Sequence, residues 1–182
     1  MKHQNIALIG FRGTGKTTVG KILARKLGRE FIDMDLRLTS EAGRDIAEWV
    51  AREGWGSFRR AESALLGVIR LQKDLVVATG GGIILNPQNR EALKEDFFAV
   101  WLKAAPQTIY DRLSADPGSP RMRPALSGMP IREEIEKELS EREPIYLQVA
   151  NVGIDTEGKA AEQVAEEIIE AGERGCIFIE KK

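Results

Sequence analysis

The chain has few of the residues on which several kinds of protein depend. Its 182 residues include one cysteine, Cys176, and one histidine, His3. A single cysteine excludes a disulfide within the chain and is typical of a reducing compartment, so we expect a cytoplasmic location. Because His3 lies before the first expected strand, catalysis by a Ser-His or Cys-His arrangement has little support.

An excess of one charge and long apolar runs are also lacking. The chain carries 27 lysines and arginines against 28 aspartates and glutamates, which gives a formal net charge of −1 at pH 7. This balance indicates neither a nucleic-acid partner nor a membrane-surface partner. No stretch approaches the roughly 20 apolar residues that span a bilayer, and the first apolar run is too short for a signal peptide. Recognition of an anion must therefore depend on a few well-placed basic side chains.

The strongest motif present is the octapeptide GFRGTGKT at residues 10–17, which matches G-x-x-x-x-G-K-T. A strand pattern precedes it and a helical pattern follows, which is the context of a phosphate-binding P-loop. Backbone N–H groups in such a turn approach phosphate closely, and the helix N-terminus favours negative charge. We expect a nucleoside triphosphate here, with Lys16 on the β- and γ-phosphates and the Thr17 hydroxyl on Mg²⁺. The predicted nucleotide-binding residues of this segment are Gly13, Thr14, Gly15, Lys16, Thr17 and Thr18. A glycine-rich turn without a ligand is the alternative.

Apolar strand patterns alternate with helical patterns along a chain whose length suits one domain. Strands are expected at residues 6–9, 30–33, 75–78, 97–102 and 152–154, and helices at 18–27, 36–55, 57–71, 87–94, 106–113, 131–149 and 159–171. Gly28 should end the first helix, and Gly43, Gly54 and Gly56 should interrupt the next two. Near-continuous apolar strands of this kind predict an α/β fold with a parallel sheet covered on both faces. Ligands bind beyond the carboxyl ends of such strands, so polar residues that follow a strand are the candidates.

Two carboxylates, Asp33 and Asp35, follow the second strand. If the strand continues, both side chains point to the same side and both could face the phosphates. One would then lie near Mg²⁺ and the other would hold or deprotonate an acceptor hydroxyl. An acidic N-cap for the next helix is the alternative.

Arg59 and Glu62, three residues apart, share one face of an expected helix. The carboxylate could orient the guanidinium as a clamp for a carboxylate or phosphate, and a surface ion pair is the alternative. Three consecutive glycines at 80–82 follow the third strand, which indicates close backbone approach or positive φ. Either a ligand packs on this turn or the turn is tight and empty.

Residues 114–130 are rich in proline and glycine and carry Arg121 and Arg123. Loops of this length are uncommon unless functional or disordered, and this one suits a lid over ATP. An arginine brought in by a lid can neutralise charge that develops on the transferred phosphoryl group. Arg142 stands alone in an expected helix, where its chemistry by itself favours a solvated side chain.

The ordered set of these motifs resembles that of the shikimate kinases. The matching segments are residues 10–17, Asp33-x-Asp35, Phe58-Arg59-x-x-Glu62, Gly80-Gly81-Gly82, Arg123-Pro124-Ala125-Leu126 and Arg142-x-Pro144-x-Tyr146. The resemblance implies a three-layer α/β/α P-loop kinase fold with a five-stranded parallel sheet and a helical substrate-binding region. It implies one kinase domain over residues 1–182, with that region at about 34–62, a lid at about 114–130 and a C-terminal tail at 172–182.

The resemblance also implies an activity, which is Mg²⁺-dependent transfer of the γ-phosphoryl group of ATP to the 3-hydroxyl of shikimate by a monomer. This step leads towards chorismate and the aromatic amino acids. Lys16, Asp35 and Arg123 would be catalytic, and Thr17 and Asp33 would hold the metal. A kinase of another small hydroxylated metabolite, such as gluconate, and a non-catalytic ATP-binding regulator are the alternatives.

The acceptor residues implied by the resemblance are Asp35, Arg59, Gly81 and Arg142. The two arginines would clamp the carboxylate of shikimate, Asp35 would anchor its hydroxyls and act as base, and Gly81 would meet it through the backbone. On the nucleotide side, Arg123 would lie over the phosphates. Arg112 would flank the adenine with the loop at 156–158.

Three features depart from the usual pattern of the family. Ala125 stands where leucine is common in the lid, which should loosen lid packing while leaving Arg123 in place. Trp55-Gly56 precedes the Phe58-Arg59 motif where an acidic residue is frequent, which alters the surface of the substrate-binding region. The tail from Gly172 extends past the typical end of the fold.

Overall fold

The computed structural model describes residues 5–116 and 129–174. Arg121 and Arg123 of the expected lid lie outside the described residues. So do His3 and Cys176, together with most of the C-terminal tail.

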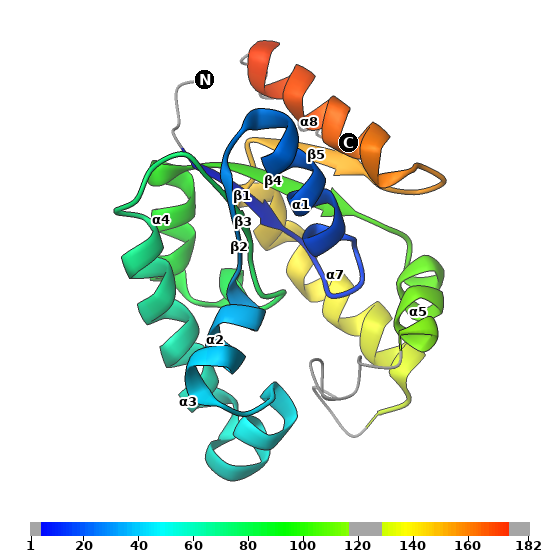
Figure 1. Cartoon of the computed structure of the whole chain (residues 1–182). Helices are drawn as coiled ribbons and strands as arrows, with labels where there is room; N and C mark the ends of the chain where they lie inside the picture. Colours follow the sequence, from blue (N-terminus) through cyan, green and yellow to red (C-terminus); the bar gives the residue numbers. More distant parts are fainter. Residues whose placement is uncertain (1–4, 117–128, 175–182) are drawn as a thin grey trace.

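The described residues form one parallel sheet with the strand order β2-β3-β1-β4-β5 (Figure 1). The strands are β1 (Asn5–Ile9), β2 (Glu30–Asp33), β3 (Leu75–Ala78), β4 (Phe97–Lys103) and β5 (Val152–Asp155). Every pairing is parallel, which confirms the expected α/β class and the five-stranded sheet. The chain leaves β1 towards β2 and β3 on one side and later towards β4 and β5 on the other. The order therefore reverses at β1, where open α/β sheets place their ligands.

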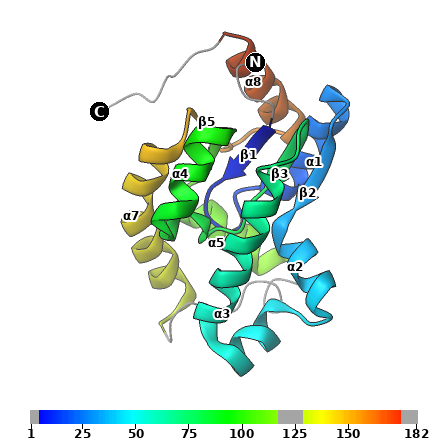
Figure 2. The same ribbon diagram turned by 90° about the vertical axis from the view of Figure 1, so that its left-hand side faces the viewer.

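Alternation of side chains along the strands divides the core into two clusters, one on each face. Ala7 and Ile9 of β1 pack on the face covered by α3, α4 and α7, and Ile6 and Leu8 pack under α1 and α8 (Figures 1 and 2). Both faces are buried, which explains why the strands read as apolar runs and not as alternating patterns. A third, small cluster joins Phe11 to α5 and α7.

The helices largely follow the expected pattern. They are α1 (Lys16–Leu27), α2 (Met34–Ala42), α3 (Ile46–Ile69), α4 (Pro87–Asp96), α5 (Pro106–Ala115), α7 (Ile131–Val149) and α8 (Ala161–Arg174), with a short 3₁₀ turn η1 (Ile83–Leu85). No helix within 5–116 or 129–174 is long and apolar enough to cross a membrane.

Glycines end or bend these helices where a left-handed backbone is needed. Gly28 and Gly43 cap α1 and α2 with φ values of 64° and 63°, as expected. Gly54 interrupts α3 with a φ of 76°, which also agrees. The expected break at Gly56 is wrong, because this residue continues the helix on the far side of the Gly54 kink. A glycine costs a helix stability but does not by itself end one.

Candidate active site

The P-loop follows β1 at the point where the strand order reverses. Its three glycines, Gly10, Gly13 and Gly15, all have positive φ, at 141°, 80° and 93°. These angles favour glycine and explain its recurrence in the motif. Gly15 is also the N-cap of α1 and has no side-chain cap, so the helix N-terminus is left for a ligand. This arrangement fits the binding of phosphate.

Side chains of the loop are held by the loop's own backbone. The Nζ atom of Lys16 donates to the carbonyl oxygens of Gly10 and Phe11, both at 2.8 Å. The Thr14 hydroxyl donates to the same Phe11 carbonyl at 2.8 Å. Lys16 therefore lies folded over the loop, with its charge at the place where phosphate would bind.

Asp33 both caps the following helix and faces the P-loop, the two roles that the sequence left open. One carboxylate oxygen accepts from the backbone N–H of Leu36 at 3.1 Å and so caps α2. The other accepts from the Thr17 hydroxyl at 2.6 Å. The cap fixes the carboxylate in the direction of the P-loop, and the pair offers a hydroxyl and a carboxylate oxygen of the kind that Mg²⁺ prefers. In the described ranges no cluster of three or more His, Cys, Asp or Glu residues could hold a metal. A Mg²⁺ ion here would thus take its remaining ligands from phosphate and water.

Asp35 lies just beyond the second strand. Because β2 ends at Asp33, as expected, and α2 begins at Met34, the strand does not continue and the condition for the two carboxylates to point the same way is not met. Asp35 is in the first turn of α2, where its carboxyl group reaches inwards and its Oδ1 atom is buried without a hydrogen-bond partner. Removal from water, then the nearby carboxylates of Glu62 and Asp33, raise its pKa to about 7. A carboxyl group with that pKa is suited to take up a proton near neutral pH.

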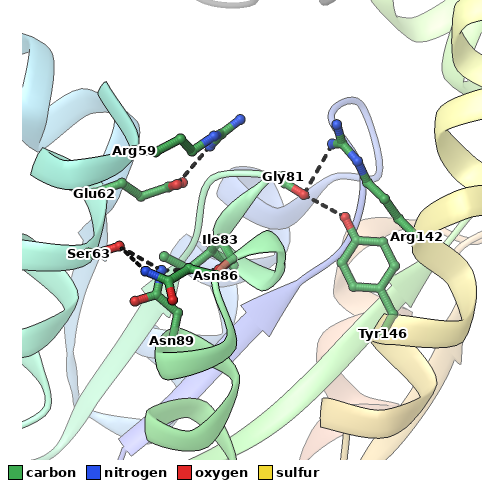
Figure 3. A network of polar contacts seen from close by, with 9 residues as sticks. All are labelled: Arg59, Glu62, Ser63, Gly81, Ile83, Asn86, Asn89, Arg142 and Tyr146. Atoms are coloured by element: carbon green, nitrogen blue, oxygen red, sulfur yellow. Dashed lines mark hydrogen bonds and ion pairs between the residues drawn. The ribbon is translucent and has the colours of Figure 1, made fainter. Parts of the chain in front are cut away.

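The Arg59–Glu62 pair forms as expected (Figure 3), and the Glu62 side chain is completely buried. Arg59 donates to Oε2 of Glu62 at 2.7 Å, and its guanidinium lies 5.0 Å from the ring centre of Trp55. Burial raises the pKa of Glu62, which the neighbouring arginine opposes. The simple alternative of a surface ion pair does not hold, because the Glu62 side chain has no exposed area.

The three glycines at 80–82 make this burial possible. None has positive φ. A Cβ atom at Gly80 would meet the Glu62 carboxylate, and one at Gly82 would meet the Arg59 guanidinium. The close approach that the sequence indicated is thus made by charged side chains of the chain itself. The turn and the Arg59–Glu62 pair are parts of one packed unit.

Arg142 reaches the same turn from the opposite side, on α7 (Figure 3). Only 5% of the residue is exposed, so the solvated side chain favoured by chemistry alone is wrong. Its guanidinium forms an ion pair with Glu138 and donates to the Gly81 carbonyl at 3.4 Å. The Tyr146 hydroxyl donates to that carbonyl at 2.7 Å. Arg59 and Arg142 therefore stand on either side of the glycine turn.

One cavity of about 280 Å³ connects the P-loop to this turn. It is lined by Arg12, Gly13, Gly15, Lys16, Thr17, Thr18, Asp33, Asp35, Thr79, Gly81, Arg112 and Asp116. Most of the predicted nucleotide and acceptor residues that the structure describes therefore share a single space. Thr14 is instead turned into the loop, and Arg59 and Arg142 flank the turn beside the cavity.

Sequence reasoning missed one basic residue of this cavity, Arg12. It occupies a variable position of the P-loop motif, and its side chain pairs with buried Glu134 of α7. Burial lowers the pKa of its guanidinium, and the Glu134 carboxylate opposes that shift. The available signal was a basic residue inside a phosphate-binding loop. Its partner, 122 positions away, could not be identified from spacing.

Arg112 of α5 connects the P-loop to the loop after β5. It donates to the Gly13 carbonyl at 3.3 Å and to the Thr156 hydroxyl at 3.2 Å. Arg112 and Thr156, both predicted near the adenine, are therefore in contact with each other at the edge of the cavity.

Comparison with known proteins gives a consistent result. Residues 12–173 match the family model of shikimate kinase. A shikimate kinase from Symbiobacterium thermophilum is 42% identical over 175 residues, which cover 94% of this chain and 99% of the relative. Shikimate kinase 2 of Yersinia enterocolitica is 42% identical over 167 residues, or 92% of each chain.

Solved structures agree. A shikimate kinase from Acinetobacter baumannii in complex with shikimate superimposes with a TM-score of 0.88 at 35% identity, covering 94% of each chain. A gluconokinase from Sinorhizobium meliloti, at 15% identity and a TM-score of 0.56, is similar in fold alone.

Proposed function

The chain belongs to the shikimate kinase family, and on that basis we propose how its residues share the work of the reaction. It is an ATP-dependent kinase that transfers the γ-phosphoryl group of ATP to the 3-hydroxyl of shikimate, giving shikimate 3-phosphate and ADP. The main support for the assignment of roles is that most of the predicted nucleotide-binding and acceptor-binding residues line one cavity. A P-loop, two aspartates and a glycine turn flanked by arginines open on one space.

On the donor side, the backbone N–H groups of the P-loop and the Lys16 ammonium would hold the triphosphate. Lys16 is at present bonded to two neutral carbonyls, with which charged phosphate oxygens compete well. Thr17 and Asp33 would hold Mg²⁺. When bound, that ion supplies positive charge against the phosphate oxygens. Arg123, outside the described residues, is proposed as a further cation over the phosphates.

On the acceptor side, Asp35 would hold the attacking hydroxyl and take its proton. Its pKa of about 7 allows it to be ionised before the transfer and protonated after it. Phosphoryl transfer requires mainly positioning and charge stabilisation. Asp35 and Lys16 line the same cavity, so the base and the donor phosphate would meet there.

The carboxylate of shikimate would be held between Arg59 and Arg142. These side chains come from α3 and α7 and flank Gly81 from two sides (Figure 3). Each is oriented by a glutamate, Glu62 or Glu138. Prior orientation reduces the entropy lost when an arginine binds a carboxylate.

We propose in addition that the chain works as a cytoplasmic monomer with one kinase domain. The lone cysteine supports a reducing compartment. The two main core clusters pack on opposite faces of a single sheet, which supports one folding unit.

The direct test is ADP release on addition of shikimate, with gluconate and no acceptor as comparisons. Arg59→Lys should raise the shikimate KM by at least tenfold, because a lysine cannot make the bidentate contact. The ATP KM should change less than twofold. Arg60→Lys is the matched control, since Arg60 is an exposed neighbour on the same helix. An unchanged shikimate KM in Arg59→Lys would refute the clamp, and turnover of gluconate alone would refute the acceptor.

A further inference from the structure

The glycine turn at residues 80–82 is held through its carbonyl groups. The carbonyls of Gly80 and Gly82 accept backbone N–H groups of η1, at 3.2 and 3.0 Å. The third carbonyl, of Gly81, accepts the hydroxyl of Tyr146 at 2.7 Å (Figure 3). All three carbonyls are therefore engaged within the protein.

The N–H groups of the same three glycines differ. Among the described residues none of them has a hydrogen-bond acceptor. Gly81 lines the cavity. A turn whose carbonyls are all occupied and whose N–H groups are not is a surface that favours oxygen atoms of a ligand.

The orientation of the Gly81 carbonyl also sets the orientation of the Gly82 N–H group. The Gly81 carbonyl and the Gly82 N–H belong to the same planar peptide unit. Whatever fixes that carbonyl fixes the direction of that N–H. Glycine places little restraint of its own on this peptide, so the restraint must come from elsewhere.

Tyr146 is well suited to supply it. The residue has no exposed area, and its ring stacks on Trp101 with 5.7 Å between ring centres and 16° between planes. Burial raises the pKa of its hydroxyl above the usual range, so it remains a donor at all ordinary pH values. The other donor to Gly81 is Arg142, at a longer 3.4 Å and already paired with Glu138.

We propose that Tyr146 is a positioning residue of the acceptor site, whose hydroxyl fixes the Gly81–Gly82 peptide and so leaves Arg142 available for the acceptor carboxylate. This inference rests on the proposed function in one respect, namely that the acceptor binds between the glycine turn and Arg142. Without the hydroxyl, the Gly81 carbonyl and the incoming carboxylate would compete for one guanidinium.

The test compares Tyr146→Phe with the wild-type chain. We expect the dissociation constant and KM for shikimate to rise about tenfold, because the incoming carboxylate must then draw Arg142 away from a buried carbonyl that has lost its Tyr146 donor. The affinity for ATP should change less than twofold, because Tyr146 does not line the cavity of the P-loop. A role in stability alone would lower the melting temperature and leave the ratio of the two affinities unchanged.

The matched control is Tyr110→Phe, the same change at the other of the chain's two tyrosines. The Tyr110 ring is covered by Arg132, at 4.1 Å. This variant should keep both affinities. An equal loss of shikimate affinity in the two variants, or none in Tyr146→Phe, would overturn the proposal. If the wild-type chain failed to phosphorylate shikimate, the proposed function would fail instead, so the two failures are distinguishable.

A second measurement does not require the variant to fold. Expression in medium that contains 3-fluorotyrosine labels both tyrosines and gives two ¹⁹F resonances. The resonance that is missing in Tyr110→Phe belongs to Tyr110, and the other belongs to Tyr146. The Tyr146 resonance should shift when shikimate is added, because a carboxylate bound to Arg142 changes the hydrogen bonding of the Gly81 carbonyl that Arg142 and Tyr146 share. ADP alone should leave the resonance unshifted. A Tyr146 resonance insensitive to saturating shikimate would overturn the proposal.

Discussion

Replacement of Glu62 by glutamine is the sharpest perturbation that the site offers. The change keeps the shape of a completely buried side chain and removes its charge. That charge serves two neighbours. It holds the Arg59 guanidinium at 2.7 Å, and it is the second-largest cause of the raised pKa of Asp35. One substitution should therefore alter acceptor binding and the pH dependence of turnover together.

The size of the binding effect follows from the lost charge. The hydrogen bond between two ionised groups contributes about 1.5–3 kcal/mol. After Glu62→Gln the guanidinium is the one charged partner, and the attraction between opposite charges is lost. Glu62→Gln should therefore weaken the hold on Arg59 by about half of that contribution, roughly 1–1.5 kcal/mol. The shikimate KM should then rise about tenfold.

The pH effect has a definite sign. A nearby negative charge favours the protonated form of Asp35, so its removal lowers the pKa from about 7. Burial, the larger cause, remains, and the pKa should stay above its ordinary value. Because Asp35 must be ionised to act as base, the acid limb of the kcat profile should move to lower pH.

Turnover should be followed between pH 5 and 9 by direct separation of ADP from ATP, which avoids pH-sensitive coupling enzymes. Glu48→Gln is the matched control, because Glu48 forms an exposed ion pair with Arg52 on the same helix. Such a surface pair contributes little. An acid limb at the wild-type pH together with an unchanged shikimate KM would refute the electrostatic linkage of Glu62 to both neighbours.

Two other substitutions test the same site. The folded pKa of Asp35 is about 7 against an ordinary 3.8, so the fold binds this proton more tightly than the unfolded chain and stability falls as pH rises through that interval. Asp35→Asn should abolish turnover. It should also raise the melting temperature at pH 8, by roughly 2–4 °C for each kcal/mol of stability gained, with little change at pH 4. Thermal unfolding at both pH values decides, and a larger gain at pH 4 contradicts the prediction. Gly82→Ala should leave the fold intact but displace Arg59, whose flexible end occupies the space of the new Cβ. Its shikimate KM should rise about tenfold at unchanged ATP affinity, whereas Gly67→Ala, which meets open space, should leave both constants unchanged.

Local patterns predicted most of the fold. The strand at residues 30–33 and the helix at 131–149 agree with the structure at both ends. Gly28 and Gly43 end their helices because a left-handed backbone favours glycine whatever surrounds it. Gly56 shows the limit of such reasoning. A glycine permits a break, but whether the helix continues depends on how the residues that follow it pack against the rest of the protein.

The residues of the candidate site also fall into those that local patterns predict and those that depend on contacts between distant parts of the chain. The P-loop could be read directly, because its function resides in eight consecutive backbone and side-chain positions. The family resemblance supplied Asp35, Arg59, Gly81 and Arg142 as a set, although chemistry alone favoured a solvated Arg142. Neither source indicated that Arg12 pairs with Glu134 or that Tyr146 bonds to Gly81.

The sequence by itself determined the phosphate-binding loop, the alternation of strands and helices that is typical of an α/β fold, and the helix ends, since each depends on residues a few positions apart. Tertiary structure decided which charges are buried and what each one contacts. Gly81 meets Arg142 and Tyr146 across 61 and 65 positions of chain. Separations of that size are closed only when α7 packs against η1 and the glycine turn that follows β3. Burial at that junction then gives Asp35, Glu62 and Tyr146 their altered pKa values.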